Sequence, residues 1–299
     1  MVNWRAEYPF HDRFQNIDGK KYHYVEVGEG EQTVVCVHGN PTWSFYYRSL
    51  LTGLKNEARV IAVDHIGCGL SEKPRDYPYT LRQHTDNLIA WLDSMDLRHV
   101  VMVVHDWGGA IGLGAAVARP DRVSKLLILN TAAFPPPYIP WRIAACRFPI
   151  LGSVGIRYFN VFARAATRMT LHWLASLSPA AKAGLLAPYS SIEHRTAIDA
   201  FVQDIPMKRN HPTYATLEQL EKDLPKLAHL PIRLVWGMQD WCFRPECLAR
   251  FRKYFPQASV RELADVGHYV MEEAPSEVLE EMRLLLQQSG PASSSHSTP

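Results

Sequence analysis

The chain has 299 residues, of which 47% are hydrophobic and 21% are charged, a balance that excludes general disorder and allows a large buried core. The formal net charge of +2 is too small to favour binding to nucleic acid. The five cysteines are odd in number and contain no CxxC pair, which disfavours a disulfide framework or zinc site and favours a reducing compartment.

Apolar runs and turn residues in the first 133 residues predict strands alternating with helices. The segment up to Gly30 alternates around Asp18-Gly19, which is typical of an antiparallel hairpin. Continuous apolar runs follow, of the kind that is buried on both faces of a sheet. We expect strands at 33–39, 58–64, 99–106 and 123–130, and helices at 81–95 and from the end of the third run to Ala118.

The alternation stops at Phe134 and resumes at Pro231. Residues 134–212 are helix-rich and aromatic, whereas 231–237 and 259–265 again predict strands and about 275–288 a closing helix. Strands alternating with helices predict an α/β fold, in which helices flank a mostly parallel sheet. We therefore predict a core of 1–133 and 213–289, an inserted helical cap of 134–212, and a small polar, disordered tail of 290–299.

The third buried strand ends in a sequence with the layout of a nucleophile elbow, Val104-His-Asp-Trp-Gly-Gly109. Its central residue is Asp106 rather than serine. A carboxylate is ionised at neutral pH, so it can displace a leaving group from carbon without a base and form an ester. The alternative is that Asp106 caps the following helix, but a cap does not need Trp-Gly-Gly after it.

Two further residues complete a catalytic triad with Asp106. His268, in a loop after the last predicted strand, would activate the water that attacks the ester. Asp240 follows the strand at 231–237 and would orient that histidine. The earlier strand ends in Asn130-Thr-Ala-Ala133, which contains no acid, and Asp265 is expected to end its strand or cap a turn.

Asn40 and Trp107 are predicted to bind the leaving group or the oxyanion. Their backbone N–H groups can form an oxyanion hole, and the Asn40 amide and Trp107 indole are further donors. Taken singly, Trp107 is explained as a core aromatic and Asn40 as a turn residue before proline. The glycine-rich segment 64–71 lacks the spacing of a phosphate loop, so we predict a structural turn there and neither a cofactor nor a metal.

The segments HGNPTWSFYYRSL, DHIGCGLSEKP, VVHDWGG, WGMQD and VGHYV together resemble haloalkane dehalogenases of the α/β-hydrolase superfamily. The resemblance spans about 33–133 and 231–275. It implies an α/β-hydrolase fold with Asp106 as nucleophile, His268 as base, Asp240 as acid, and Asn40 with Trp107 as the halide-binding pair. Asp240 combined with Asn40 resembles the subgroup that also contains the β-lactone decarboxylases of long-chain olefin biosynthesis.

The motifs leave three activities open. A dehalogenase would consume water and release halide and alcohol through an alkyl-aspartyl ester, and this is the first choice. A β-lactone decarboxylase would release carbon dioxide and an alkene. An epoxide hydrolase would use cap tyrosines, for which Tyr138, Tyr158, Tyr189 and Tyr214 are available, although Asn40 argues mildly against it. A non-catalytic binding module is disfavoured because no member of the triad is missing.

The cap carries a net positive charge, whereas the rest of the chain is net negative. Residues 134–212 contain nine Lys or Arg and three acids, a net charge of +6 that leaves −4 for the rest of the chain. A segment that is both basic and apolar is a candidate for contact with a membrane surface or an acidic protein. The alternative is that its basic residues form a solvated outer face, while its apolar residues form a lid over the binding site of a hydrophobic, long-chain substrate. No secretory signal or spanning segment is evident, so we expect a cytoplasmic protein. Membrane association through the cap and oligomerisation both stay open.

Overall fold

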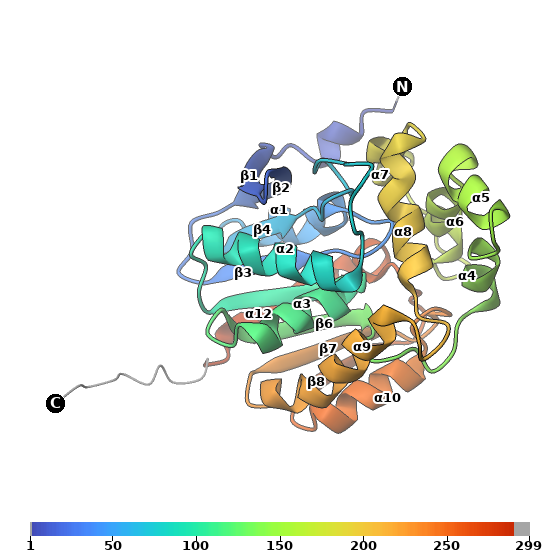
Figure 1. The fold of residues 1–299 in the computed structure, drawn as a ribbon. Coiled ribbons are helices and arrows are strands. Elements are labelled where there is room, and N and C mark those ends of the chain that lie inside the picture. Colours follow the sequence, from blue (N-terminus) through green and yellow to red (C-terminus); the bar gives the residue numbers. More distant parts are fainter. Residues whose placement is uncertain (1, 290–299) are drawn as a thin grey trace.

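A computed structural model describes residues 2–289 and contains one eight-stranded sheet (Figure 1). The strand order is β1-β2-β4-β3-β5-β6-β7-β8. The β1–β2 and β2–β4 pairs are antiparallel, and the remaining pairs are parallel. The strands are β1 (Arg13–Ile17), β2 (Lys20–Val27), β3 (Thr33–Val37), β4 (Arg59–Val63), β5 (Val100–Asp106), β6 (Val123–Thr131), β7 (Ile232–Gly237) and β8 (Ser259–Leu263).

The central strands are apolar throughout because both faces of the sheet are buried. In β5, Val100, Met102 and Val104 belong to one hydrophobic cluster, while Val101 and Val103 belong to the other. Side chains of α2, α3, α9 and α10 complete the first cluster, and those of α1 and α12 the second. These helices are α1 (Arg48–Leu54), α2 (Leu81–Ser94), α3 (Trp107–Ala118), α9 (Pro212–Asp223), α10 (Pro245–Tyr254) and α12 (Pro275–Gln287).

Five helices between β6 and β7 gather at one side of the sheet (Figure 1). They occupy the segment for which the sequence predicts a cap. The next helix, α9, instead packs against α2 and α3. The five helices are α4 (Trp141–Cys146), α5 (Leu151–Phe159), α6 (Val161–Met169), α7 (Pro179–Leu186) and α8 (Thr196–Asp204). The short helix α11 spans Val270–Glu273, and the 3-10 turns are Trp4–Glu7, Ser44–Tyr47, Ala187–Tyr189, Glu193–Arg195 and Leu224–Leu227.

The structure confirms the strands and helices predicted for the core. Their observed ends differ from the predicted ends by about two residues or fewer. The hairpin turns at Asp18 and Gly19, which both have positive φ. The strand expected at 259–265 ends earlier, at Leu263, because the next residues form a turn. The predicted disordered tail, 290–299, lies outside the described residues.

The glycine-rich segment 64–71 is a turn, as predicted. The buried Asp64 carboxylate accepts hydrogen bonds from the backbone N–H groups of Ser44, at 2.7 Å, and Leu70, at 2.8 Å. It also contacts the ring of His23, at 2.7 Å. Gly69 has a φ of 48°, and a Cβ there would collide with the Asp64 carboxylate. The segment therefore fixes the loop after β4 to the loop after β3.

All five cysteines are free thiols. Across residues 2–289, no helix has the length and apolar character needed to cross a membrane. In the same residues, no three His, Cys, Asp or Glu side chains converge as a group that could hold a metal ion.

Candidate active site

Asp106 is held at the end of β5 in an unusual backbone conformation, with a φ of 53° and a ψ of −130°. Its side chain makes no capping hydrogen bond to α3; its Oδ1 instead accepts one from the backbone N–H of Asn40, at 2.7 Å. A Cβ on Gly39 would collide with this carboxylate, and one on Gly108 would collide with the carbonyl of Val37. The glycines thus let three segments meet closely, and the helix-cap explanation for Asp106 is wrong.

His268 lies between two carboxylates. Its Nδ1 is 2.8 Å from Oδ2 of Asp240, and its Nε2 is 3.5 Å from Oδ2 of Asp106. The backbone N–H of His268 donates to the carbonyl of Thr170, which ties the loop after β8 to the end of α6. All three members of the predicted triad are buried and lie in one line of contacts.

The two carboxylates set the protonation of His268. Burial by itself lowers the pKa of the imidazole, but attraction to Asp240 and the contact with Asp106 outweigh this and raise it to about 10. Burial also tends to raise the pKa of Asp106, yet the hydrogen bond and charge of His268 hold it below its ordinary value. With a pKa of about 10, His268 is an imidazolium at neutral pH, in contact with Asp106 and Asp240. Once Asp106 becomes a neutral ester, His268 loses part of the attraction that keeps it protonated.

Asp240 is oriented by a residue whose role was not predicted. Nδ2 of Asn130 donates to Oδ2 of Asp240, at 3.0 Å, while Oδ1 of Asn130 accepts from the backbone N–H of Gly237, at 2.7 Å. The other oxygen of Asp240 accepts from the backbone N–H of Cys242, at 2.6 Å. A polar residue at the end of the apolar run 123–130 was the available signal. Asp265 is exposed in a turn, so it takes no part.

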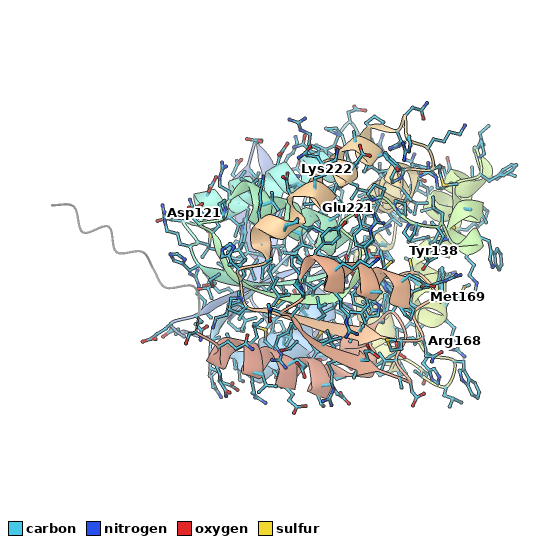
Figure 2. All side chains as sticks on the ribbon, turned by 90° about the horizontal axis from the view of Figure 1, so that it is seen from below. Asp121, Tyr138, Arg168, Met169, Glu221 and Lys222 are labelled. Atoms are coloured by element: carbon cyan, nitrogen blue, oxygen red, sulfur yellow. The ribbon has the colours of Figure 1, made fainter. Side chains whose placement is uncertain are left out.

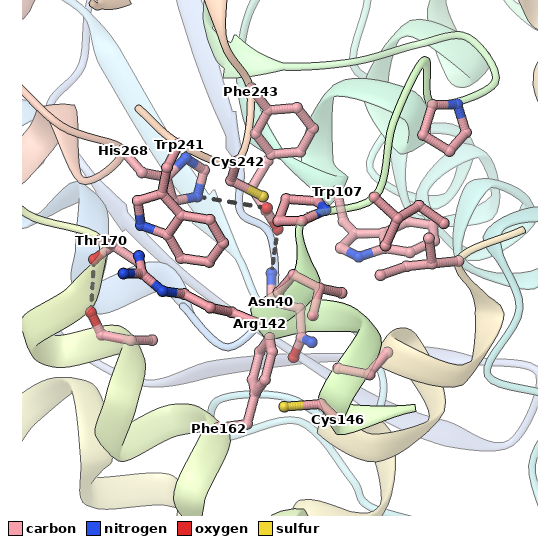
Figure 3. A pocket seen from close by; sticks show the side chains of 18 of the residues that line it. Asn40, Trp107, Arg142, Cys146, Phe162, Thr170, Trp241, Cys242, Phe243 and His268 are labelled. Atoms are coloured by element: carbon pink, nitrogen blue, oxygen red, sulfur yellow. Dashed lines mark hydrogen bonds and ion pairs between the residues drawn. The ribbon is translucent and has the colours of Figure 1, made fainter. Parts of the chain in front are cut away.

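Asn40 and Trp107 line the same cavity as Asp106 and His268. The Asn40 amide donates to the carbonyl of Ile198 in α8, at 3.3 Å, and its Oδ1 is buried without a hydrogen-bond partner among residues 2–289. The Trp107 indole packs beside Phe201, with ring centroids 5.3 Å apart. Figure 3 shows Asn40, Trp107 and His268 around one space. The structure thus brings all five predicted site residues together.

The cavity has a volume of about 280 Å³ and is lined mainly by apolar side chains, most of them from the cap segment. Arg142 of α4 is the one charged cap residue in this lining. Its Nε is buried without a hydrogen-bond partner in the described residues, and its guanidinium lies 5.1 Å from the ring centroid of Trp241. Sequence reasoning counted Arg142 only toward the cap's charge. Apolar lining residues include Pro136, Ile143, Phe162, Ala165, Met169, Val202, Leu217 and Phe243.

The four tyrosines considered for epoxide opening are not free donors in this cavity. Only Tyr138 lines it, and its hydroxyl donates to the carbonyl of Cys242, at 2.6 Å, and accepts from the backbone N–H of Arg244. Tyr158 is exposed, and Tyr189 is buried beside Thr42. Tyr214 is not among the lining residues. The arrangement that epoxide hydrolases use is therefore not present among these side chains.

Comparison with known proteins places these features in context. The profile of the α/β-hydrolase fold family matches residues 32–275. The chain is 43% identical to a cis-3-alkyl-4-alkyloxetan-2-one decarboxylase of Shewanella oneidensis, over 91% of this chain and 86% of that protein. It is 30% identical to haloalkane dehalogenase 2 of Mycobacterium tuberculosis, over 91% of this chain and 93% of that protein. A crystal structure of a mutant of the haloalkane dehalogenase DatA from Agrobacterium tumefaciens superimposes with a TM-score of 0.83 at 28% identity, covering 93% of this chain and 97% of that one.

Proposed function

We propose that this chain, which belongs to the α/β-hydrolase family, decarboxylates cis-3,4-dialkyl β-lactones to alkenes through an ester on Asp106. One structural observation carries the proposal: a buried carboxylate lies in an apolar cavity, is held on a strained turn, and faces the imidazole ring of His268 instead of capping its helix. The 43% identity to a decarboxylase, against 30% to a dehalogenase, supports the β-lactone over the haloalkane.

The reaction needs two steps and no water. A carboxylate oxygen of Asp106 attacks the ring carbon that bears the lactone oxygen, and the bond between that carbon and the ring oxygen breaks. The ring oxygen becomes part of a carboxylate that stays attached to the neighbouring carbon. The bond between this carboxylate and its neighbouring carbon then breaks, and the electron pair forms the carbon–carbon double bond. Asp106 is expelled as a carboxylate. The products are carbon dioxide, the alkene and the unmodified enzyme.

The residues around Asp106 suit both steps. Asn40 and Trp107 supply donors at the place where negative charge develops on the leaving oxygen. His268, which has a raised pKa, stabilises Asp106 as it regains its charge in the second step. In the same cavity, the Arg142 guanidinium attracts the carboxylate that ring opening releases. The apolar lining accommodates the two alkyl substituents.

Dehalogenation is the second candidate, because the fold superimposes on a haloalkane dehalogenase with a TM-score of 0.83. In that reaction Asp106 displaces halide from a carbon atom, and Asn40 and Trp107 hold the halide. His268 must then act as a base on water. Esterification of Asp106 favours this, since it removes one of the two charges that keep the imidazole protonated.

The proposal is tested by giving the wild-type protein a cis-3,4-dialkyl β-lactone and, separately, a 1-bromoalkane of matched length. We expect alkene and carbon dioxide from the lactone at a rate well above bromide release, with no oxygen taken up from labelled water. Fast bromide release with negligible alkene would replace the proposal with the dehalogenase. Opening of an epoxide alone would contradict both.

The cellular location is part of the same proposal. The five free thiols support a reducing, cytoplasmic environment. Cell fractionation with an antibody to the native chain would test this, and recovery from an oxidising compartment would contradict it.

A further inference from the structure

Exposed hydrophobic side chains are concentrated on one part of the cap. Within residues 2–289, fourteen large hydrophobic residues are strongly exposed, and ten of them lie between Trp141 and Leu174. We call this region, residues 141–174, the cap face. It comprises α4, α5, α6 and the turn after α6, and the exposed side chains include Trp141, Ile150, Leu151, Phe159 and Trp173. Single exposed hydrophobic residues are ordinary, but a cluster of this kind marks an interaction surface.

The cap face is also strongly positive. It contains five arginines and no Asp or Glu. Arg164 and Arg168 are exposed on α6, and Figure 2 shows Arg168 next to Met169 at the end of the molecule remote from Asp121. Hydrogen bonds from the guanidinium of Arg168 go to backbone carbonyls of the following turn. The positive charge is therefore available to an external anion.

The cap face adjoins the catalytic cavity. Val161 and Met169 line that cavity, and yet they are 43% and 37% exposed, so the cavity reaches the surface there. A second, shallow groove between α4 and α5 is lined by Phe148 and Leu151. It shares Val161 and Cys146 with the lining of the cavity. The alkyl chain of a ligand bound on the cap face would thus lie next to the opening of the catalytic cavity.

We infer that the cap face docks on a lipid bilayer with anionic headgroups. Aromatic and aliphatic side chains that enter the headgroup boundary, mixed with arginines that remain at headgroup depth, are the combination that interfacial segments use. A second copy of the chain is a poor partner, because two such faces would bring together the exposed Arg164 and Arg168 of both copies, and residues 141–174 contain no acid to pair with them. Ile150 has a φ of 65°, a conformation unfavourable for a β-branched residue that is 78% exposed. Under the proposed function, a bilayer would deliver long-chain lactone directly to the cavity.

Flotation with vesicles tests the apolar part of this surface. The variant Ile150→Asn/Phe159→Gln/Trp173→Gln removes three exposed side chains that do not line the catalytic cavity. The matched control, Phe14→Gln/Leu284→Gln, removes exposed side chains from β1 and α12. We expect the triple variant to bind phosphatidylcholine–phosphatidylglycerol vesicles about 100-fold more weakly than the wild type, and the control to bind as the wild type does.

A second pair of variants tests the charge. Arg164→Gln/Arg168→Gln should weaken binding to the same vesicles about 30-fold, whereas Lys55→Gln/Lys253→Gln, which changes exposed lysines outside the cap, should have little effect. High salt should reduce binding of the wild type. Equal flotation with pure phosphatidylcholine would refute the role of anionic headgroups.

The outcomes separate this inference from the proposed function. Turnover of a short-chain β-lactone dispersed in water is measured without vesicles on the same samples, and the surface variants should retain it. If the wild type does not turn over the lactone, the proposed function is refuted, and the flotation result still tests the docking surface. Absence of wild-type flotation would overturn the docking surface, as would equal flotation of the triple variant. Self-association that the triple variant abolishes, without flotation, would assign the face to a second copy, and salt-sensitive binding to an acidic protein alone would assign it to a protein partner.

Discussion

Replacing Asp240 by asparagine should lower the pKa of His268 by about three units. The Asp240 carboxylate contacts Nδ1 of His268 at 2.8 Å in a buried site. With charge centres about 4 Å apart and an effective dielectric constant of about 20, the attraction is about 4 kcal/mol, which corresponds to about three pKa units. The pKa of about 10 should therefore fall to about 7.

The pKa of His268 can be followed by NMR titration of its imidazole carbon, assigned by the signal missing from His268→Gln. Glu273→Gln is the matched control, because Glu273 bonds to the backbone N–H groups of Gly267 and His172 and not to the imidazole. It should move the pKa by less than about one unit. Alkene formation by Asp240→Asn should fall about 1,000- to 10,000-fold, because an amide neither orients the imidazole ring nor stabilises its positive charge as the Asp240 carboxylate does. A shift below about one unit in Asp240→Asn would refute the electrostatic reasoning.

Three further results are expected. His268→Gln with a 1-bromoalkane should accumulate an alkyl adduct, visible by intact-protein mass spectrometry, because the ester forms and water is not activated; an unmodified mass with continued bromide release would count against His268 as the base. The pKa of His268 is raised on folding, so its stabilisation is complete below about pH 6.5 and is lost as the pH rises through about 10. The Tm of the wild type should thus fall between pH 7 and 10 more steeply than that of His268→Gln, and parallel curves would argue against a buried imidazolium. Asn130→Ala should destabilise the fold by about 2–3 kcal/mol and reduce turnover about 100-fold through misplacement of Asp240, and unchanged kinetics would remove Asn130 from the site.

The sequence is sufficient for the elbow because its requirements are local. A buried strand, a sharp turn and a glycine-rich helix start are all encoded within Val104–Gly109, and Gly108 is needed where the helix passes the carbonyl of Val37. The positions of His268 and Asp240 follow from the same rule, since each comes after the carboxyl end of a strand. Parallel strands bring these ends to one edge of the sheet.

Asn130 and Arg142 could not be assigned from the sequence because their roles depend on distant partners. Asn130 meets Asp240 across 110 positions of the chain. In the sequence, Asn130 is notable only because its segment, 130–133, lacks the acid that could have served in the triad. Arg142 is one of nine basic cap residues, and nothing in the local sequence distinguishes it, the one that lines the cavity, from the other eight. The contact of its guanidinium with the ring of Trp241, about 100 positions later in the chain, depends on the tertiary fold.

The cap face illustrates the same limit for surfaces. Residues 141–174 show apolar and basic residues together, which fits both a solvated lid and an interfacial segment. The distinction requires knowing which side chains the neighbouring helices cover. Ile156 of α5 is fully buried in a hydrophobic cluster, while Phe159, three residues later in the same helix, is 66% exposed. Only the tertiary packing of α5 separates the two.

The central claim is that the Asp106 carboxylate bonds directly to a carbon atom of the substrate. Turnover of a cis-3,4-dialkyl β-lactone by Asp106→Ala, compared with the wild type at equal concentration of folded protein, tests it most directly. We predict a loss of alkene formation of at least about 1,000-fold, with circular dichroism and thermal unfolding showing an intact fold. Alkene formation at the wild-type rate would show that the reaction does not pass through Asp106.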